Sequence, residues 1–224
     1  MRQKHRILSL ATAAVILVFG LAAGLPAGAT DKGTVVDRAT FDAGVPSGWT
    51  GFSDFNGCEF TRSADGDKQY QRIPSGDNDT CANHTPGAPG PGDVSISNSF
   101  SANPDEVYKG YAKGWIENPV DSVAQVKILF WKNTSSGREF IGECFGKTSS
   151  TSSTVFNTCC HRAGPNPPEI TAANGCKAPS GTDEVVISYR IHAQDAGASG
   201  RAVLDRITFG RCNEGNDCSN VTSP

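Results

Sequence analysis

Six aromatic, amide and basic side chains occupy alternate positions along three segments of the sequence, and their chemistry suits a polar ligand. They are Tyr111, Trp115, Gln125, Trp131, Arg190 and His192. Sugar rings stack their flat C–H faces on aromatic rings and pair their hydroxyl groups with amide and guanidinium groups. If the three segments lie in one sheet with their apolar stripes inward, this set predicts an outward glycan-binding face. The alternative is that Trp115 and Trp131 are core residues.

Sequence motifs of common enzymes are missing from the chain. There is no Gly-x-Ser-x-Gly elbow, no HExxH pair and no phosphate-binding loop. His192 ends the polar face of a predicted strand, where a histidine is more often a hydrogen-bonding group than a catalytic base. Paired carboxylates of a glycosidase need only lie roughly 5 to 10 Å apart in space, so a hydrolase or lyase stays an alternative to a non-catalytic binder.

Alternation with a period of two places the six residues on strands. In 106–117 the small residues and Tyr108 share one face, while aromatics and lysines share the other. In 123–131 the apolar stripe ends at Phe130 and leaves Trp131 on the opposite face. A shift of one residue would exchange the faces, so the pattern predicts Phe130 inside and Trp131 outside.

The remaining periodic segments complete an all-β pattern. A half-buried strand at 185–192 is followed by a Gly- and Ala-rich break and a second run at 201–209, which predicts a hairpin-like return. Further strands are expected at 94–100 and 139–145. We expect little helix and an antiparallel sandwich.

Short phrases near both ends of the chain resemble the galactose-binding-like β-sandwich of carbohydrate-binding modules. Phe41-Asp42 precedes a Gly/Pro turn that ends at Trp49, and Pro179, Gly181 and Thr182 lead into a long strand. The resemblance implies an antiparallel jelly-roll β-sandwich with disulfide-stapled loops that binds a polysaccharide or glycan. The insertion at 157–177 departs from the family pattern.

The same resemblance implies a structural calcium ion. In the family an early acidic residue, backbone carbonyls and an aspartate on the last strand often hold this ion, and the matching positions are Asp42 and Asp205. Calcium needs several oxygen ligands, so the first and last strands would have to be neighbours. The alternative is that both carboxylates are solvated or cap nearby backbone.

The N-terminus has the features of a secretory signal. Arg2, Lys4 and Arg6 precede an uncharged run that ends near Leu25, and small residues at 27 and 29 fit a cleavage site. We expect a cleaved signal at 1–29, a β-sandwich domain at 30–211, a C-terminal tail at 212–224 and a secreted product. An uncleaved membrane anchor is the alternative, because about 20 apolar residues span a bilayer.

Eight cysteines follow the predicted signal. They are Cys58, Cys81, Cys144, Cys159, Cys160, Cys176, Cys212 and Cys218. An even count in an exported chain predicts an oxidised framework of four disulfides, in which Cys212 and Cys218 could close a small loop. Zinc is the rival interpretation, but no CxxC pair is present.

Charge limits the classes of partner. The chain has 20 Lys and Arg against 23 Asp and Glu, and loss of the signal makes the remainder more acidic. Nucleic-acid binding needs a basic patch and is therefore not expected, nor is a membrane partner for the mature form. We expect a monomeric glycan binder; a cell-surface structural or adhesion protein is the main alternative.

Overall fold

The computed structural model describes residues 33–41, 46–51, 61–62, 69–73, 96–194, 199–213 and 215–224. The chain divides into the units Met1–Thr30 and Asp31–Pro224, and every described residue belongs to the second unit. The predicted signal, Asp42, Cys58 and Cys81 lie outside the described residues. Within the described ranges no helix is long and apolar enough to span a membrane.

The described residues form strands, turns and bends and contain no helix. The strands are β1 Thr34–Thr40, β2 Thr50–Gly51, β3 Thr61–Arg62, β4 Gln69–Ile73, β5 Ile96–Ser101, β6 Val107–Val120, β7 Ser122–Thr134, β8 Gly137–Thr148, β9 Thr154–Asn157, β10 His161–Ala163, β11 Glu169–Ile170, β12 Cys176–Lys177, β13 Glu184–Ala193 and β14 Ser199–Arg211. The segments predicted at 106–117, 123–131 and 139–145 are β6, β7 and β8.

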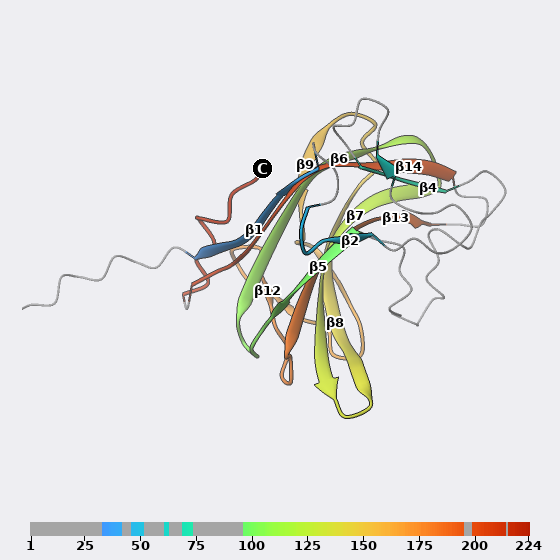
Figure 1. Ribbon diagram of the computed structural model, residues 1–224. Helices are drawn as coiled ribbons and strands as arrows, with labels where there is room; N and C mark the ends of the chain where they lie inside the picture. Colours follow the sequence, from blue (N-terminus) through green and yellow to red (C-terminus); the bar gives the residue numbers. More distant parts are fainter. Residues whose placement is uncertain are drawn as a thin grey trace, which may run out of the picture. The chain divides into compact units, whose positions relative to one another are not determined.

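Two antiparallel sheets pack face to face (Figure 1). Sheet A has the strand order β11-β12-β6-β14-β4-β3, with β1 also paired to β14 and β9 to β6. Sheet B has the order β10-β8-β7-β13-β5-β2. The expected all-β antiparallel sandwich is confirmed.

The apolar stripes of both sheets meet in one core. Its members from the long strands include Tyr108, Ala112, Ile116, Val126, Ile128, Phe130, Val185, Ile187, Tyr189, Ile191, Leu204, Ile207 and Phe209. Phe130 is fully buried in this core, and Trp131 follows on the opposite face of β7. The prediction that Phe130 points inward is therefore confirmed, whereas Trp131 is 6% exposed and thus buried on the other face instead of open to solvent.

Glycines on the inner face of β6 let the two sheets approach closely. A Cβ at Gly110 would lie 2.8 Å from Ile187 of the facing sheet. The Tyr189 hydroxyl crosses the core from sheet B and donates a 2.7 Å hydrogen bond to the Val203 carbonyl in sheet A. Complete burial raises the pKa of Tyr189. This polar contact ties the layers together inside an apolar core.

Gly114→Ala should destabilise the fold by about 1–3 kcal/mol through overpacking. The new Cβ would lie 2.5 Å from the Val203 carbonyl oxygen and 2.6 Å from the Tyr189 hydroxyl oxygen. The check is a urea unfolding curve of Gly114→Ala alone and combined with Tyr189→Phe, which removes one of the two obstructing atoms. An unchanged unfolding midpoint for the single variant would contradict the close approach.

The predicted hairpin between 185–192 and 201–209 is wrong. β13 lies in sheet B between β7 and β5, whereas β14 lies in sheet A between β6 and β4. Both strands point an apolar stripe at the same core. The alternation alone therefore could not show whether β14 pairs with β13 in one sheet or lies in the facing sheet across the core.

Three disulfides connect the described cysteines. Cys144 of β8 and Cys176 of β12 link sheet B to sheet A, and the adjacent residues Cys159 and Cys160 pair with each other. Cys212 and Cys218 close the small loop that the sequence predicted. Three of these six cysteines belong to the 157–177 insertion, and the Cys144–Cys176 bond fastens this insertion to β8 of sheet B.

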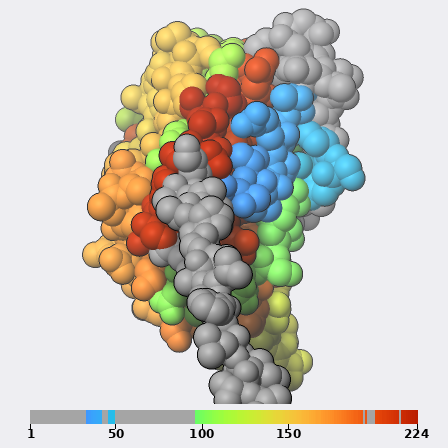
Figure 2. Space-filling view, turned by 90° about the vertical axis from the view of Figure 1, so that its left-hand side faces the viewer, coloured from blue at the N-terminus to red at the C-terminus, as the bar shows by residue number. Residues whose placement is uncertain are grey.

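The segment after β14 packs on the outer face of sheet A. Val107, Cys212, Cys218 and Val221 form a small buried cluster, with Tyr111 packed against it. Figure 2 shows the red C-terminal part between the blue β1 and the orange segment that precedes β13. The part of the chain predicted as a tail therefore covers one face of β6.

Hydrogen bonds to Glu106 should make part of the stability depend on pH. Burial by itself raises the pKa of this carboxyl, but bonds from Tyr108, Asn103 and Arg211 outweigh burial and lower it to about 2. Because the folded pKa lies below the ordinary value, the stabilisation is complete above about pH 4.5 and is lost as the pH falls towards 2.

Melting temperatures of the wild type and Glu106→Gln between pH 2 and 5 test this expectation. The difference in melting temperature between the wild type and Glu106→Gln should shrink as the pH falls, because the wild type with a protonated Glu106 then resembles the variant. A constant difference in melting temperature over this pH range would contradict the expected pH dependence.

Candidate functional site

The structure separates the six predicted ligand residues into two groups. Gln125 and Trp131 lie on β7 and Arg190 and His192 on β13, which are neighbouring strands of sheet B. The other two residues lie on β6 in sheet A, so the expectation that all three segments share one sheet is wrong. The physical reason is that β6 and β7 lie in opposite layers, although both present their apolar stripes to one core.

Three of the predicted residues form a hydrogen-bonded chain on the outer face of sheet B. Arg190 Nε donates to Gln125 Oε1 at 3.0 Å, and an Arg190 terminal nitrogen lies 3.3 Å from His192 Nδ1. Gln125 and Arg190 are buried, and His192 is half-buried. Gln125 and Arg190 are directly opposite each other on the adjacent strands β7 and β13, which brings their side chains together.

A buried ion pair lies on the same face. Lys127 Nζ is 2.6 Å from Glu143 Oε2, and the two side chains are only 1% and 8% exposed. Neither Lys127 nor Glu143 is among the six ligand residues that the sequence predicted, and the pairing of Glu143 was missed. Its partnership depends on the pairing of β7 with β8, where Leu129 stands opposite Glu143, and no local pattern reveals that register.

Aromatic rings border this polar cluster. Phe145 stacks on His161 with ring centroids 5.0 Å apart, and Lys127 Nζ lies 5.9 Å from the Phe145 ring centre. At the other end Trp131 meets Phe140 edge to face at 5.3 Å. Phe140, Phe145 and His161 are half-buried, so part of each ring stays accessible. We name the half-buried rings, Phe140, Phe145, His161 and His192, the aromatic rim.

Trp131 does not form an open stacking platform. It is only 6% exposed, and Arg138 covers its ring at 4.6 Å. Its indole Nε1 has no hydrogen-bond partner among the residues that the structure describes. The expectation that Trp131 and Trp115 share one outward face is also wrong, because these residues lie on different sheets.

Tyr111 and Trp115 lie on the outer face of sheet A. Trp115 is half-buried, and its Nε1 donates to Glu117 Oε1 at 3.2 Å. Glu117 in turn accepts a 2.7 Å hydrogen bond from Arg201 Nε. Tyr111 is half-buried and packs beside Lys109, whose Nζ lies 5.3 Å from the ring centre.

Asp205, the described member of the expected calcium pair, contacts two basic side chains. The carboxylate of Asp205 contacts Lys113 Nζ at 2.7 Å and Arg206 Nε at 3.4 Å, so two cations already occupy it. β1 does pair with β14, which satisfies the condition that first and last strands are neighbours. Asp42 lies outside the described residues, and within them no cluster of three or more metal-binding side chains occurs.

No protein-family model and no curated protein matches this chain. Among similar solved structures are the CBM22-1–GH10 modules of the Clostridium thermocellum endo-1,4-β-D-xylanase 10B complexed with xylohexaose, with 11% identity, coverage of 79% of this chain and 28% of that chain, and a TM-score of 0.38. The C-terminal family 22 carbohydrate-binding module of Xyn10B from the same organism has 9% identity, coverage of 80% and 94%, and a TM-score of 0.40.

The K3 cleaved adhesin domain of Lys-gingipain from Porphyromonas gingivalis w83 is also similar, with 11% identity, coverage of 79% and 99%, and a TM-score of 0.36. Carbohydrate-binding modules and an adhesin domain are thus among the structural neighbours. The strands of this chain define its fold, and the side chains described above define its candidate site.

Proposed function

We propose that this protein binds a polysaccharide or glycan without cleaving it, through the outer face of sheet B. The observation that carries the proposal is the buried ion pair between Lys127 and Glu143 on a face that lies outside the core. Buried ion pairs contribute little net stability, because desolvation offsets their attraction. Ligand recognition gives a reason for such a pair, since a fixed pair keeps the neighbouring, half-buried Phe145 ring ordered before the ligand binds.

Each part of the face has a distinct task in this proposal. The stacked Phe145–His161 pair and the edge of Phe140 offer flat apolar surface to the C–H faces of sugar rings. The buried Gln125–Arg190 and Lys127–Glu143 pairs lie beneath the aromatic rim and hold it in place. The half-buried His192 meets the hydroxyls at the surface. Trp131 supports the rim from within, since it is buried.

Export of the protein belongs to the same proposal. Three disulfides among the described cysteines support an oxidising compartment, because such bonds rarely persist where thiols are kept reduced. A secreted, non-catalytic module would meet its polysaccharide outside the cell.

Phe145→Leu should lower the affinity for the polysaccharide about tenfold, which corresponds to about 1.4 kcal/mol. Leucine keeps apolar volume at the half-buried position but removes the flat ring, so stability should change little. Binding is measured by pulldown on a panel of insoluble polysaccharides, with a reducing-sugar assay of the supernatant. Trp115→Phe on sheet A is the matched control and should bind as the wild type does.

Several outcomes would overturn the proposal. Released reducing sugar would show an enzyme, and protein partners that no sugar displaces would favour the adhesion alternative. Equal binding by wild type and Phe145→Leu, with equal melting temperatures, would exclude the aromatic rim as the contact surface.

A further inference from the structure

A pocket lies on the outer face of sheet A, on the opposite side of the sandwich from the proposed binding face. Its volume is about 470 Å³, within the usual range of about 300 to 1,000 Å³ for small-ligand sites. The lining residues come from the outer face of β6, the turn before β12 and the C-terminal segment; they include Lys109, Tyr111, Ala173, Asp217, Ser219 and Thr222. The pocket therefore belongs to sheet A and shares no residue with the aromatic rim.

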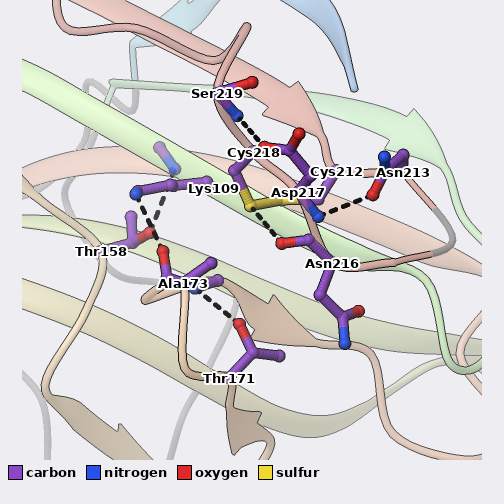
Figure 3. The surroundings of a disulfide bond; sticks show 12 residues. Lys109, Thr158, Thr171, Ala173, Cys212, Asn213, Asn216, Asp217, Cys218 and Ser219 are labelled. Atoms are coloured by element: carbon purple, nitrogen blue, oxygen red, sulfur yellow. Dashed lines mark hydrogen bonds between the residues drawn. A yellow bond between two sulfur atoms is a disulfide. The ribbon is translucent and has the colours of Figure 1, made fainter. Parts of the chain in front are cut away.

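The walls of this pocket are held by covalent and backbone contacts. The Cys212–Cys218 disulfide closes the loop above β6, and Cys212 N donates to the Val107 carbonyl at 2.7 Å. Within the loop Asp217 N donates to Asn213 Oδ1 at 2.6 Å. Figure 3 shows Lys109 and Ala173 on one side of the disulfide, with Asp217 and Ser219 above them. A ligand would thus meet a preformed site and spend little free energy on ordering it.

Polar groups of both kinds face a ligand in this pocket. Lys109 Nζ donates one hydrogen bond, of 2.9 Å, to the Ala173 carbonyl, and among the described residues its other N–H groups have no acceptor. Asp217 Oδ1 accepts from Ser219 N at 2.8 Å, and its second oxygen has no donor within the described part of the chain. The hydroxyls of Ser219 and Thr222 are exposed beside them.

The balance of these groups identifies the class of ligand. One ammonium and one carboxylate cancel, so the pocket favours a neutral molecule over an anion or a cation. The half-buried ring of Tyr111 adds an apolar surface beside donors, an acceptor and hydroxyls. A neutral sugar ring needs all of these together: an aromatic neighbour, hydrogen-bond donors and acceptors at close range.

We propose that this pocket is a second binding site, which takes a single neutral pyranose unit. Tyr111 contacts the apolar side of the ring, Lys109 donates to one hydroxyl and Asp217 accepts from another. The inference is independent of the site on sheet B. If both sites are occupied, one molecule holds two sugar chains on opposite faces of its sandwich, which raises avidity for a polysaccharide network.

The probes for the test are the methyl glycosides of glucose, galactose, mannose and xylose. Each is added at millimolar concentration to the ¹⁵N-labelled protein, and amide shifts are recorded. At least one glycoside should shift the amides of Ala173 and Ser219 on the pocket wall. Asp217→Asn keeps the acceptor for Ser219 N but replaces the free oxygen, and Lys109→Met keeps the side-chain stem but removes the ammonium. Both variants should weaken the response about tenfold or more, a loss that matches one charge-assisted hydrogen bond.

Two controls make the result specific. Lys113→Met makes the same change four residues further along the same face of β6, outside the pocket, and should leave the glycoside response intact. Phe145→Leu should also leave it intact while weakening the polysaccharide pulldown, so failure at one site is distinguishable from failure at the other. The proposal is overturned if no glycoside shifts the pocket amides, or if Lys109→Met and Asp217→Asn respond as the wild type with unchanged melting temperatures.

Discussion

Trp131→Ala should lower the free energy of unfolding by about 3–5 kcal/mol, as expected for loss of a buried tryptophan. The ring is 6% exposed and packs against Phe140 at 5.3 Å and beneath Arg138 at 4.6 Å. Urea unfolding measures the loss. Trp131→Phe should cost less, because phenylalanine retains most of the packing and the indole Nε1 has no partner to lose within the described residues.

Trp115→Ala is the comparison on the other sheet. Its ring is half-buried and its Nε1 bonds Glu117, so truncation should cost less than at Trp131. An unchanged unfolding midpoint for Trp131→Ala would mean that the ring is exposed in solution and available for stacking. If the loss occurs as expected, reduced binding by Trp131→Ala would reflect unfolding, so ligand contact must be tested at the aromatic rim.

Loss of the disulfide between the sheets should be the second large effect. The double variant Cys144→Ala and Cys176→Ala should lose about 3–4 kcal/mol, because the bond restricts a long loop in the unfolded chain. The two cysteines are 32 positions apart, and both are buried. Denaturant unfolding under non-reducing conditions measures the loss. Alanine avoids placing a hydroxyl in the core.

The Cys212–Cys218 disulfide offers a matched control with a shorter loop. These cysteines are also buried but only 6 positions apart, so the double alanine variant should lose about 2 kcal/mol. A larger loss there than at Cys144–Cys176 would contradict the loop-length argument. The same variant loosens one wall of the sheet A pocket, so it should also weaken the glycoside response at Ser219 without changing the polysaccharide pulldown.

The two proposed sites differ in construction. On sheet B, charged groups are buried under a partly exposed aromatic rim, which suits the extended surface of a polysaccharide. On sheet A, a disulfide loop and the strand face border an open pocket beside one tyrosine, which suits one sugar unit.

Much of the local structure could be predicted from the sequence. The alternation in 106–117 and 123–131 identified which side chains of β6 and β7 enter the core, including Phe130. The proximity of Cys212 and Cys218 predicted their disulfide correctly. These features depend on neighbours along the chain, where a period of two or a short loop leaves few alternatives.

The pairing of distant groups was decided only by the tertiary structure. A period of two shows which face of a strand is buried, but both layers of a sandwich point at one core, so it cannot assign β6 to sheet A or β13 and β14 to different sheets. The Lys127–Glu143 pair depends on the register of β7 against β8. The pocket beside Tyr111 depends on a C-terminal segment that folds back over β6. Each of these contacts joins residues whose separation in the sequence carries no information about their distance in space.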